Sequence, residues 1–145
     1  MLGETYTQKL RSKARHYLTE RNLNSCAVFT STQFHQGFIS DYHYEYLMDK
    51  IQEKIKEVLP SDCALGCNRL VFMDTDINTC LERIRYREEE VSMEEMGDYL
   101  MQLKSEYEDY FLQFQELNGV SSVLKIKSDA LTESSIEKIK KLVLE

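Results

Sequence analysis

The sequence has no apolar run of the roughly 18 to 20 residues that a membrane-spanning helix needs, and its first residues lack the pattern of a secretory leader. These absences predict a cytoplasmic protein. Basic residues are also few, because 18 Lys and Arg stand against 25 Asp and Glu, for a formal net charge of −7. Nonspecific nucleic-acid binding depends on basic surface, so this balance argues against it and requires any phosphate site to be compact.

Cysteine and proline are sparse as well. Cys26, Cys63, Cys67 and Cys80 do not have the spacing of a disulfide framework, and a zinc site at Cys63 and Cys67 would need two more ligands at recognisable spacing. We therefore expect reduced thiols and no metal at the cysteines. The single proline, Pro60, stands where a helix should end, and no repeat or low-complexity linker divides the chain. Residues 1–145 are predicted to form one domain.

Apolar periodicity predicts an alternation of helices and strands. A run that is apolar throughout, at residues 70–73, is typical of a strand buried on both faces of a parallel sheet. Ser92 and Glu95 have the spacing of a capping box, and Gly37 is a helix stop. Strands separated by helices predict an α/β fold with a parallel sheet. The expected strands are 16–19, 70–73 and 123–126, and the expected helices are 5–13, 24–36, 41–58, one from 77 onward, 92–117 and 136–143.

Three arginines fall within two turns at the end of the helix expected from residue 77. They are Arg83, Arg85 and Arg87, and we expect their guanidinium groups to converge. Like charges at this spacing repel one another, which favours an anionic partner, and the planar arginine fork suits phosphate. The alternative is that Glu82 and the acidic run 88–90 neutralise the arginines on a solvated face.

Several segments occur together in an order that resembles the deoxynucleoside kinases. Residues 75–84 follow an apolar strand as the segment leading into the lid does in that family, and Asp98-Tyr99-Leu100 follows at matching distance. Upstream, Glu20-Arg21-Asn22, Gly37 and Asp41-Tyr42 reproduce a strand ending in Glu-Arg-Ser, a helix, a glycine and an aromatic-rich helix. The resemblance covers about residues 5–143. A thymidylate kinase-like protein would share the lid but explains the Glu-Arg element less well.

The resemblance implies a partial P-loop kinase-like fold, with three layers, helices on both faces of a parallel sheet, and a family strand order of 2-3-1-4-5. These 145 residues would be the C-terminal portion of that domain, with the first two strands missing. No Gly-x-x-x-x-Gly-Lys-[Ser/Thr] motif occurs in the sequence, so nothing in it would cradle the β- and γ-phosphates of ATP. The general base of the family would also lie upstream.

The implied activity is ATP-dependent phosphorylation of a deoxynucleoside 5′ hydroxyl in nucleotide salvage, with ATP and Mg²⁺ as cofactors. Glu20 would help hold Mg²⁺, and Arg21 would reach toward the reacting hydroxyl. The lid arginines would stabilise charge on the transferred phosphoryl group. Two registers of the lid stay open. In one, Arg83 and Arg87 take this role; in the other, Arg85 and Arg87 take it and Glu90 binds the sugar.

Base recognition differs from the family pattern. The resemblance places Cys26, Phe29 and Thr30 among the substrate-binding positions, but Cys26 and Ala27 replace an Asp-Arg pair, and Asn22 replaces the family serine. The second functional hypothesis is therefore a non-catalytic, shortened paralogue that binds nucleotide or pairs with a full-length kinase. A homodimer is a further expectation.

Overall fold

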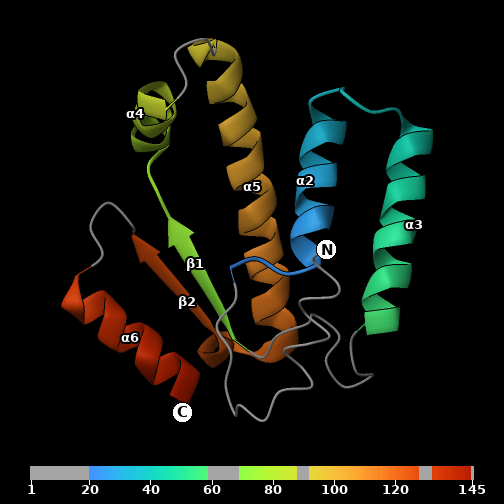
Figure 1. Cartoon of the computed structure of the whole chain (residues 1–145). Coiled ribbons are helices and arrows are strands. Elements are labelled where there is room, and N and C mark those ends of the chain that lie inside the picture. The colour runs from blue at the N-terminus through green and yellow to red at the C-terminus, as the bar shows by residue number, and fades with distance from the viewer. Residues whose placement is uncertain (1–19, 59–68, 88–91, 128–131, 145) are drawn as a thin grey trace. The chain divides into compact units, whose positions relative to one another are not determined.

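The computed structural model describes residues 20–58, 69–87, 92–127 and 132–144, and it separates into two compact units, residues 1–68 and 69–145 (Figure 1). The helix expected at 5–13 and the strand expected at 16–19 lie outside the described residues. None of the described helices is long and apolar enough to cross a membrane.

The first unit contributes a pair of packed helices, α2 (Asn24–His35) and α3 (Asp41–Val58), which confirms both predicted helices. Gly37 ends α2 with a φ of +74°, a conformation that glycine adopts without steric cost, and its N–H donates to the Phe34 carbonyl at 2.8 Å. Phe34 stacks on Tyr44 with ring centroids 4.4 Å apart. Val28 of α2 and Ile55 of α3 are buried.

The second unit is built around two parallel strands, β1 (Leu70–Asp74) and β2 (Val123–Lys127), paired from Leu70 with Val123 to Asp74 with Lys127. Between them the chain forms α4 (Ile77–Arg87), α5 (Met93–Asn118) and a short 3₁₀ turn, η1 (Val120–Ser122); α6 (Glu133–Leu144) follows β2. α5 packs against both strands and α6 against β2 (Figure 1). The predicted α/β class with a parallel sheet is confirmed for a sheet of two strands.

Local sequence signals set the ends of the long helix α5. The Ser92 side chain accepts a hydrogen bond from the Glu95 backbone N–H at 3.4 Å, the first half of the predicted capping box. Gly119, at a φ of +85°, ends the helix, and its N–H donates to the Gln115 carbonyl at 2.8 Å. The chain then turns through η1 into β2, and the position where α5 ends lets β2 run alongside β1.

The sheet faces are less covered than the sequence predicts. Phe72 faces α5, with its ring 6.4 Å from that of Tyr107 and 5.7 Å from that of Phe111. Met73 points to the other face and is 39% exposed, so the prediction that residues 70–73 are buried on both faces is wrong. The physical reason is the small sheet: within the described residues β1 pairs with β2 alone, and α6 packs against β2.

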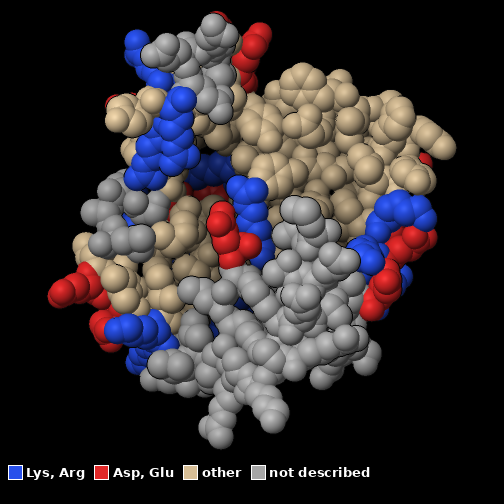
Figure 2. Space-filling view, in the orientation of Figure 1, with Lys and Arg blue, Asp and Glu red and all other residues tan. Residues whose placement is uncertain are grey.

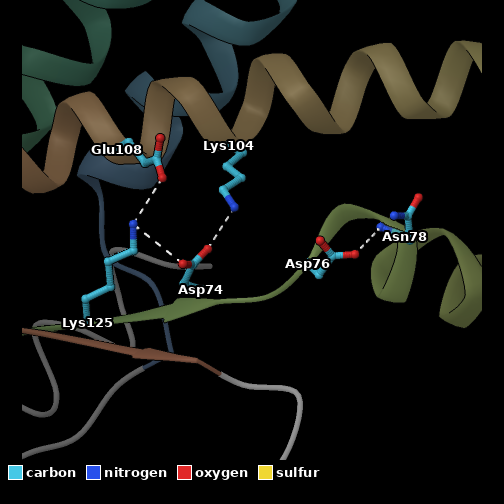
Figure 3. A network of polar contacts seen from close by, with 6 residues as sticks. All are labelled: Asp74, Asp76, Asn78, Lys104, Glu108 and Lys125. Atoms are coloured by element: carbon cyan, nitrogen blue, oxygen red, sulfur yellow. Dashed lines mark hydrogen bonds and ion pairs between the residues drawn. The ribbon is translucent and has the colours of Figure 1, made fainter.

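A polar network ties both strands to α5 on the face that carries Phe72 (Figure 3). One Asp74 carboxylate oxygen accepts from Lys104 of α5 at 2.9 Å, and the other lies 3.6 Å from Lys125 of β2. Lys125 also pairs with Glu108 of α5 at 3.1 Å and lies over the Phe72 ring at 5.3 Å. The hydrogen bond from Lys104, with help from the charge of Lys125, lowers the pKa of Asp74 below its ordinary value, although partial burial opposes this shift.

Phe114 is the most buried apolar side chain described, with no exposed surface. We expect Phe114→Ala to lower the free energy of unfolding by about 3 to 5 kcal/mol, because it removes a large buried ring and leaves a cavity. Leu112→Ala on the same helix is the matched control, since Leu112 is 53% exposed and should change stability by less than about 1 kcal/mol. Urea unfolding followed by circular dichroism measures both; equal losses would contradict this packing.

The Asp74 network predicts a pH dependence of stability. Because the pKa of Asp74 is lower in the folded than in the unfolded protein, its contribution is present above the unfolded pKa of about 4 and is lost as the pH falls through the folded value. Asp74→Asn should therefore cost about 1 to 2 kcal/mol at neutral pH, and the deficit should shrink on acidification below about pH 4.

Urea unfolding of both proteins at neutral and acid pH tests this expectation. Asp109→Asn, at an exposed aspartate of α5, is the control and should stay within about 0.5 kcal/mol of the parent at each pH. A deficit for Asp74→Asn that is the same at both pH values would rule out the ionised carboxylate as its source.

Candidate functional site

The helix α4 is fixed at its base by the chain that leaves β1. The Asp76 carboxylate accepts a hydrogen bond from the Asn78 backbone N–H at 2.9 Å, and the Asp76 carbonyl accepts one from the Cys80 N–H at 3.0 Å (Figure 3). An aspartate before the first turn satisfies otherwise unpaired N–H groups and suits the positive end of the helix dipole. Further along, Leu81 lies 4.0 Å from the position of a Cβ on Gly97, so α4 packs closely against α5.

The three arginines predicted for the lid lie on two different sides of α4. Each helical residue advances by about 100°, so Arg83 and Arg87, four residues apart, share one flank, while Arg85 lies on the other. The face between the two flanks carries the half-buried Ile84, and Tyr86, 91% exposed, points the opposite way. The helix therefore brings together two of the three guanidinium groups, and the expectation that all three converge is wrong for α4.

These arginines are available to a ligand. All three are exposed, and among the described residues none of them forms an ion pair, including with Glu82. Basic side chains stand out on the surface around α4, at the upper left of Figure 2. Arg85 and Arg87 lie in the last turn, where a positive charge stabilises a helix by about 0.3 to 1 kcal/mol. The acidic residues 88–90, and with them the predicted sugar ligand Glu90, lie outside the described residues.

The Glu-Arg element lies in the first unit, directly before α2. The Glu20 side chain is 92% exposed, and its carboxylate lies 4.0 Å from Nε of Arg21. Arg21 has a φ of +60°, the left-handed region that non-glycine residues rarely adopt. Its guanidinium lies over the Phe29 ring, 5.0 Å from the centroid, which is within the range of a cation–π contact. A strained backbone and an aromatic contact together direct this arginine side chain.

Asn22 takes over a structural task. Its side-chain oxygen accepts from the Ser25 N–H at 3.3 Å, while the Ser25 hydroxyl accepts from the Asn22 N–H at 3.4 Å. This reciprocal pair closes the start of α2 as a capping box does, and both residues are buried. This pair therefore holds the entry to α2 and the turn at Arg21 in place.

The substrate-binding candidates in α2 share one face of that helix. Cys26, Phe29 and Thr30 have the spacing of neighbours three and four residues apart, and all three are half-buried. Val28 and Thr32, on a different side, are buried. Phe29 contacts Arg21, so this candidate also helps to position the arginine of the Glu-Arg element.

The described carboxylates are spread apart, which limits how they can hold a magnesium ion. No group of three or more potential ligands lies together among the described residues, so these residues form no cage made by protein alone. Mg²⁺ bound with a nucleotide usually takes one or two carboxylates and fills its other positions with phosphate oxygens and water. The carboxylate of Glu20 is exposed and fits the role of one such ligand.

The network of Asp74, Lys104, Glu108 and Lys125 was not predicted from the sequence. A signal was present: Lys104 falls at helical spacing from Leu100 and Phe111, so a lysine interrupts the apolar stripe of α5. Its side chain is only 33% exposed, and that of Asp74 only 13%. A half-buried lysine needs a partner, and the aspartate at the end of β1 supplies it.

Comparisons with curated proteins and with solved structures found no match. The model of the family described as deoxynucleoside kinase, by contrast, matches residues 2–145, which is all but the first residue of the chain. The matched range covers Glu20 and Arg21, both parallel strands and the arginine-bearing helix described above. The chain belongs to the deoxynucleoside kinase family.

Proposed function

We propose that the protein carries the nucleotide-binding elements of a kinase that transfers the ATP γ-phosphate to the 5′ hydroxyl of a deoxynucleoside in nucleotide salvage, an activity that these 145 residues do not complete by themselves. The observation that carries this proposal is the pair of exposed arginines on one flank of α4, in a chain that the family model matches over residues 2–145. Phosphoryl transfer depends on positioning and on stabilising negative charge, and arginine does both through parallel hydrogen bonds.

The shared flank favours one of the two lid registers. Arg83 and Arg87 can reach the same phosphate group because they lie one helical turn apart, whereas Arg85 and Arg87 point away from each other. We therefore assign the phosphate-binding role to Arg83 and Arg87. In this register Glu89 stands where the family has its last lid arginine, and Ser92 where it has the sugar-binding glutamate.

Glu20 and Arg21 would act near the acceptor hydroxyl. Glu20 would give one oxygen ligand to the Mg²⁺ that accompanies ATP, an ion that neutralises phosphate charge when bound. Arg21 would donate hydrogen bonds toward the 5′ hydroxyl, in a direction set by its backbone turn and by Phe29. Cys26 and Thr30 would line the substrate surface.

A second candidate function is supported by a specific difference. Cys26 and Ala27 replace the Asp-Arg pair by which the family contacts the base and its surroundings, and these 145 residues contain no phosphate-loop motif. A non-catalytic protein that binds nucleotide, or that pairs with a full-length kinase or with a second copy of itself, would need neither feature. The two functions share the lid arginines and differ in turnover.

Because no phosphate loop is present in these 145 residues, the purified chain should give no detectable ATP-dependent phosphorylation of a panel of deoxynucleosides. Radiolabelled ATP and chromatography of the products measure this, with a known deoxynucleoside kinase as positive control. Turnover by the chain alone would overturn the argument from the missing loop. In a second assay the chain is mixed with the known kinase, and a change in the rate of that kinase would favour the regulatory function.

Arg87→Ala and Arg83→Ala should each weaken binding of Mg²⁺-ATP by about 1 to 3 kcal/mol, because each removes a charge-assisted hydrogen bond to phosphate. Arg85→Ala should have a smaller effect, since Arg85 lies on the other flank. Calorimetric titration at low salt measures the three variants.

Two controls make this test specific. Lys138→Ala removes one exposed positive charge from α6 and should leave ATP affinity unchanged, which separates local contacts from net charge. Adenosine, which has no phosphate, should bind every variant equally. A larger loss for Arg85→Ala than for Arg83→Ala would reverse the register, and no loss for any arginine would demote the lid assignment.

A further inference from the structure

Asp74 occupies a special place in the chain because it stands at the root of the lid-bearing helix. It is the last residue of β1, and only Thr75 and Asp76 separate it from the start of α4. Its ion-pair partner Lys104 lies on α5, the helix that begins at Met93 after residues 88–91. The 2.9 Å contact between them therefore joins the two arms that flank the lid segment, at their base (Figure 3).

From this geometry we propose that Asp74 and Lys104 are positioning residues that set the direction of α4, and so hold Arg83 and Arg87 where they meet a bound phosphate. The lid part of the inference rests on the proposed function. Neither residue needs to touch the ligand. Their effect passes through the angle at which α4 leaves the sheet.

The environment of the pair favours a firm contact. The Asp74 side chain is 13% exposed, so water screens its charges less than it screens those of a surface pair. Lys125, at 3.6 Å, adds a second cation from β2 and is itself held by Glu108 of α5 at 3.1 Å. Asp74 is thus attached to a neighbouring strand and a neighbouring helix at once, which fixes the point where the chain turns into α4.

A small change in the angle of α4 at its first residue produces a large displacement of the arginines near its other end. The 11 residues of α4 span about 16 Å, so a tilt of about 10° at the base moves the far end by about 3 Å. A displacement of that size exceeds the tolerance of a hydrogen bond to phosphate. The contact of Leu81 with α5 near Gly97 lies about halfway along the helix, so the ion pair and this contact together define its direction.

A merely structural role makes a different prediction. If the pair only adds stability, its loss should lower the free energy of unfolding and leave the ATP affinity of the folded protein unchanged. If the ion pair positions α4, its loss should weaken ATP binding by the folded protein. Its loss should also speed amide exchange in the first turns of α4 when no nucleotide is present.

The experiment compares Lys104→Met with Lys104→Arg in the full chain. Lys104→Met removes the charge but keeps an apolar stem of similar length, and Lys104→Arg keeps the charge. We expect Lys104→Met to weaken Mg²⁺-ATP binding by about 3- to 10-fold and to raise hydrogen–deuterium exchange in residues 77–84, while Lys104→Arg stays within about 2-fold of the parent. Asp74→Asn should reproduce Lys104→Met from the other side of the pair.

Matched controls separate the alternatives. Lys140→Met breaks the exposed Lys140–Glu137 pair of α6 and should change neither readout. Phe114→Leu weakens the core at the far end of α5 and should lower stability without changing ATP affinity. Lys104→Met with parental ATP affinity and parental exchange in α4 would overturn the inference.

The two readouts also distinguish this inference from the proposed function. If Arg83→Ala and Arg87→Ala leave ATP binding unchanged, the lid role and the proposed function both fail, and faster exchange in α4 would still support the ion pair as its anchor. If the arginine variants weaken binding and Lys104→Met does not, the proposed function stands and the positioning role is rejected.

Discussion

The attraction between one carboxylate and two ammonium groups organises the second unit. Asp74 joins β1 to α5 through Lys104 and to β2 through Lys125, on the sheet face where Phe72 packs against the aromatic rings of α5. Each charge would be unfavourable in this half-buried place by itself, because partial burial removes water from it. Together they satisfy one another, and the strands, the long helix and the root of α4 share one fixed point.

Helical periodicity then decides which arginines can act together. The sequence offers three at alternate positions, but a helix separates alternate positions and unites those four apart. Arg83 and Arg87 therefore form a pair on one flank of α4, and Arg85 lies on the other flank. A cluster of charges in a sequence becomes a binding surface only after the secondary structure has sorted its members, and here that sorting favours one lid register.

The sequence predicted the regular elements of the described regions well and the polar contacts poorly. Apolar periodicity located the helices at 24–36, 41–58, 77 onward and 92–117, and the short apolar runs located both strands of the parallel sheet, because period and burial are local properties. The helix ends predicted at Ser92 and Gly37 were confirmed for the same reason, because capping signals are local. The exposure of Met73 and the pairing of Asp74 with Lys104 depend on which strands and helices meet, and no local pattern contains that information. The Glu-Arg element and the lid were predicted through family resemblance.

The left-handed backbone at Arg21 has a consequence for how the protein tolerates change. An arginine at a φ of +60° costs about 1 to 2 kcal/mol relative to glycine, and asparagine adopts that conformation more readily than arginine does. A search for more stable variants would therefore favour glycine or asparagine at this position and discard the guanidinium above Phe29. The stability of the turn and the proposed role of Arg21 place opposite demands on this one residue, so a thermostabilised version of the chain would be expected to have lost part of its Glu-Arg element.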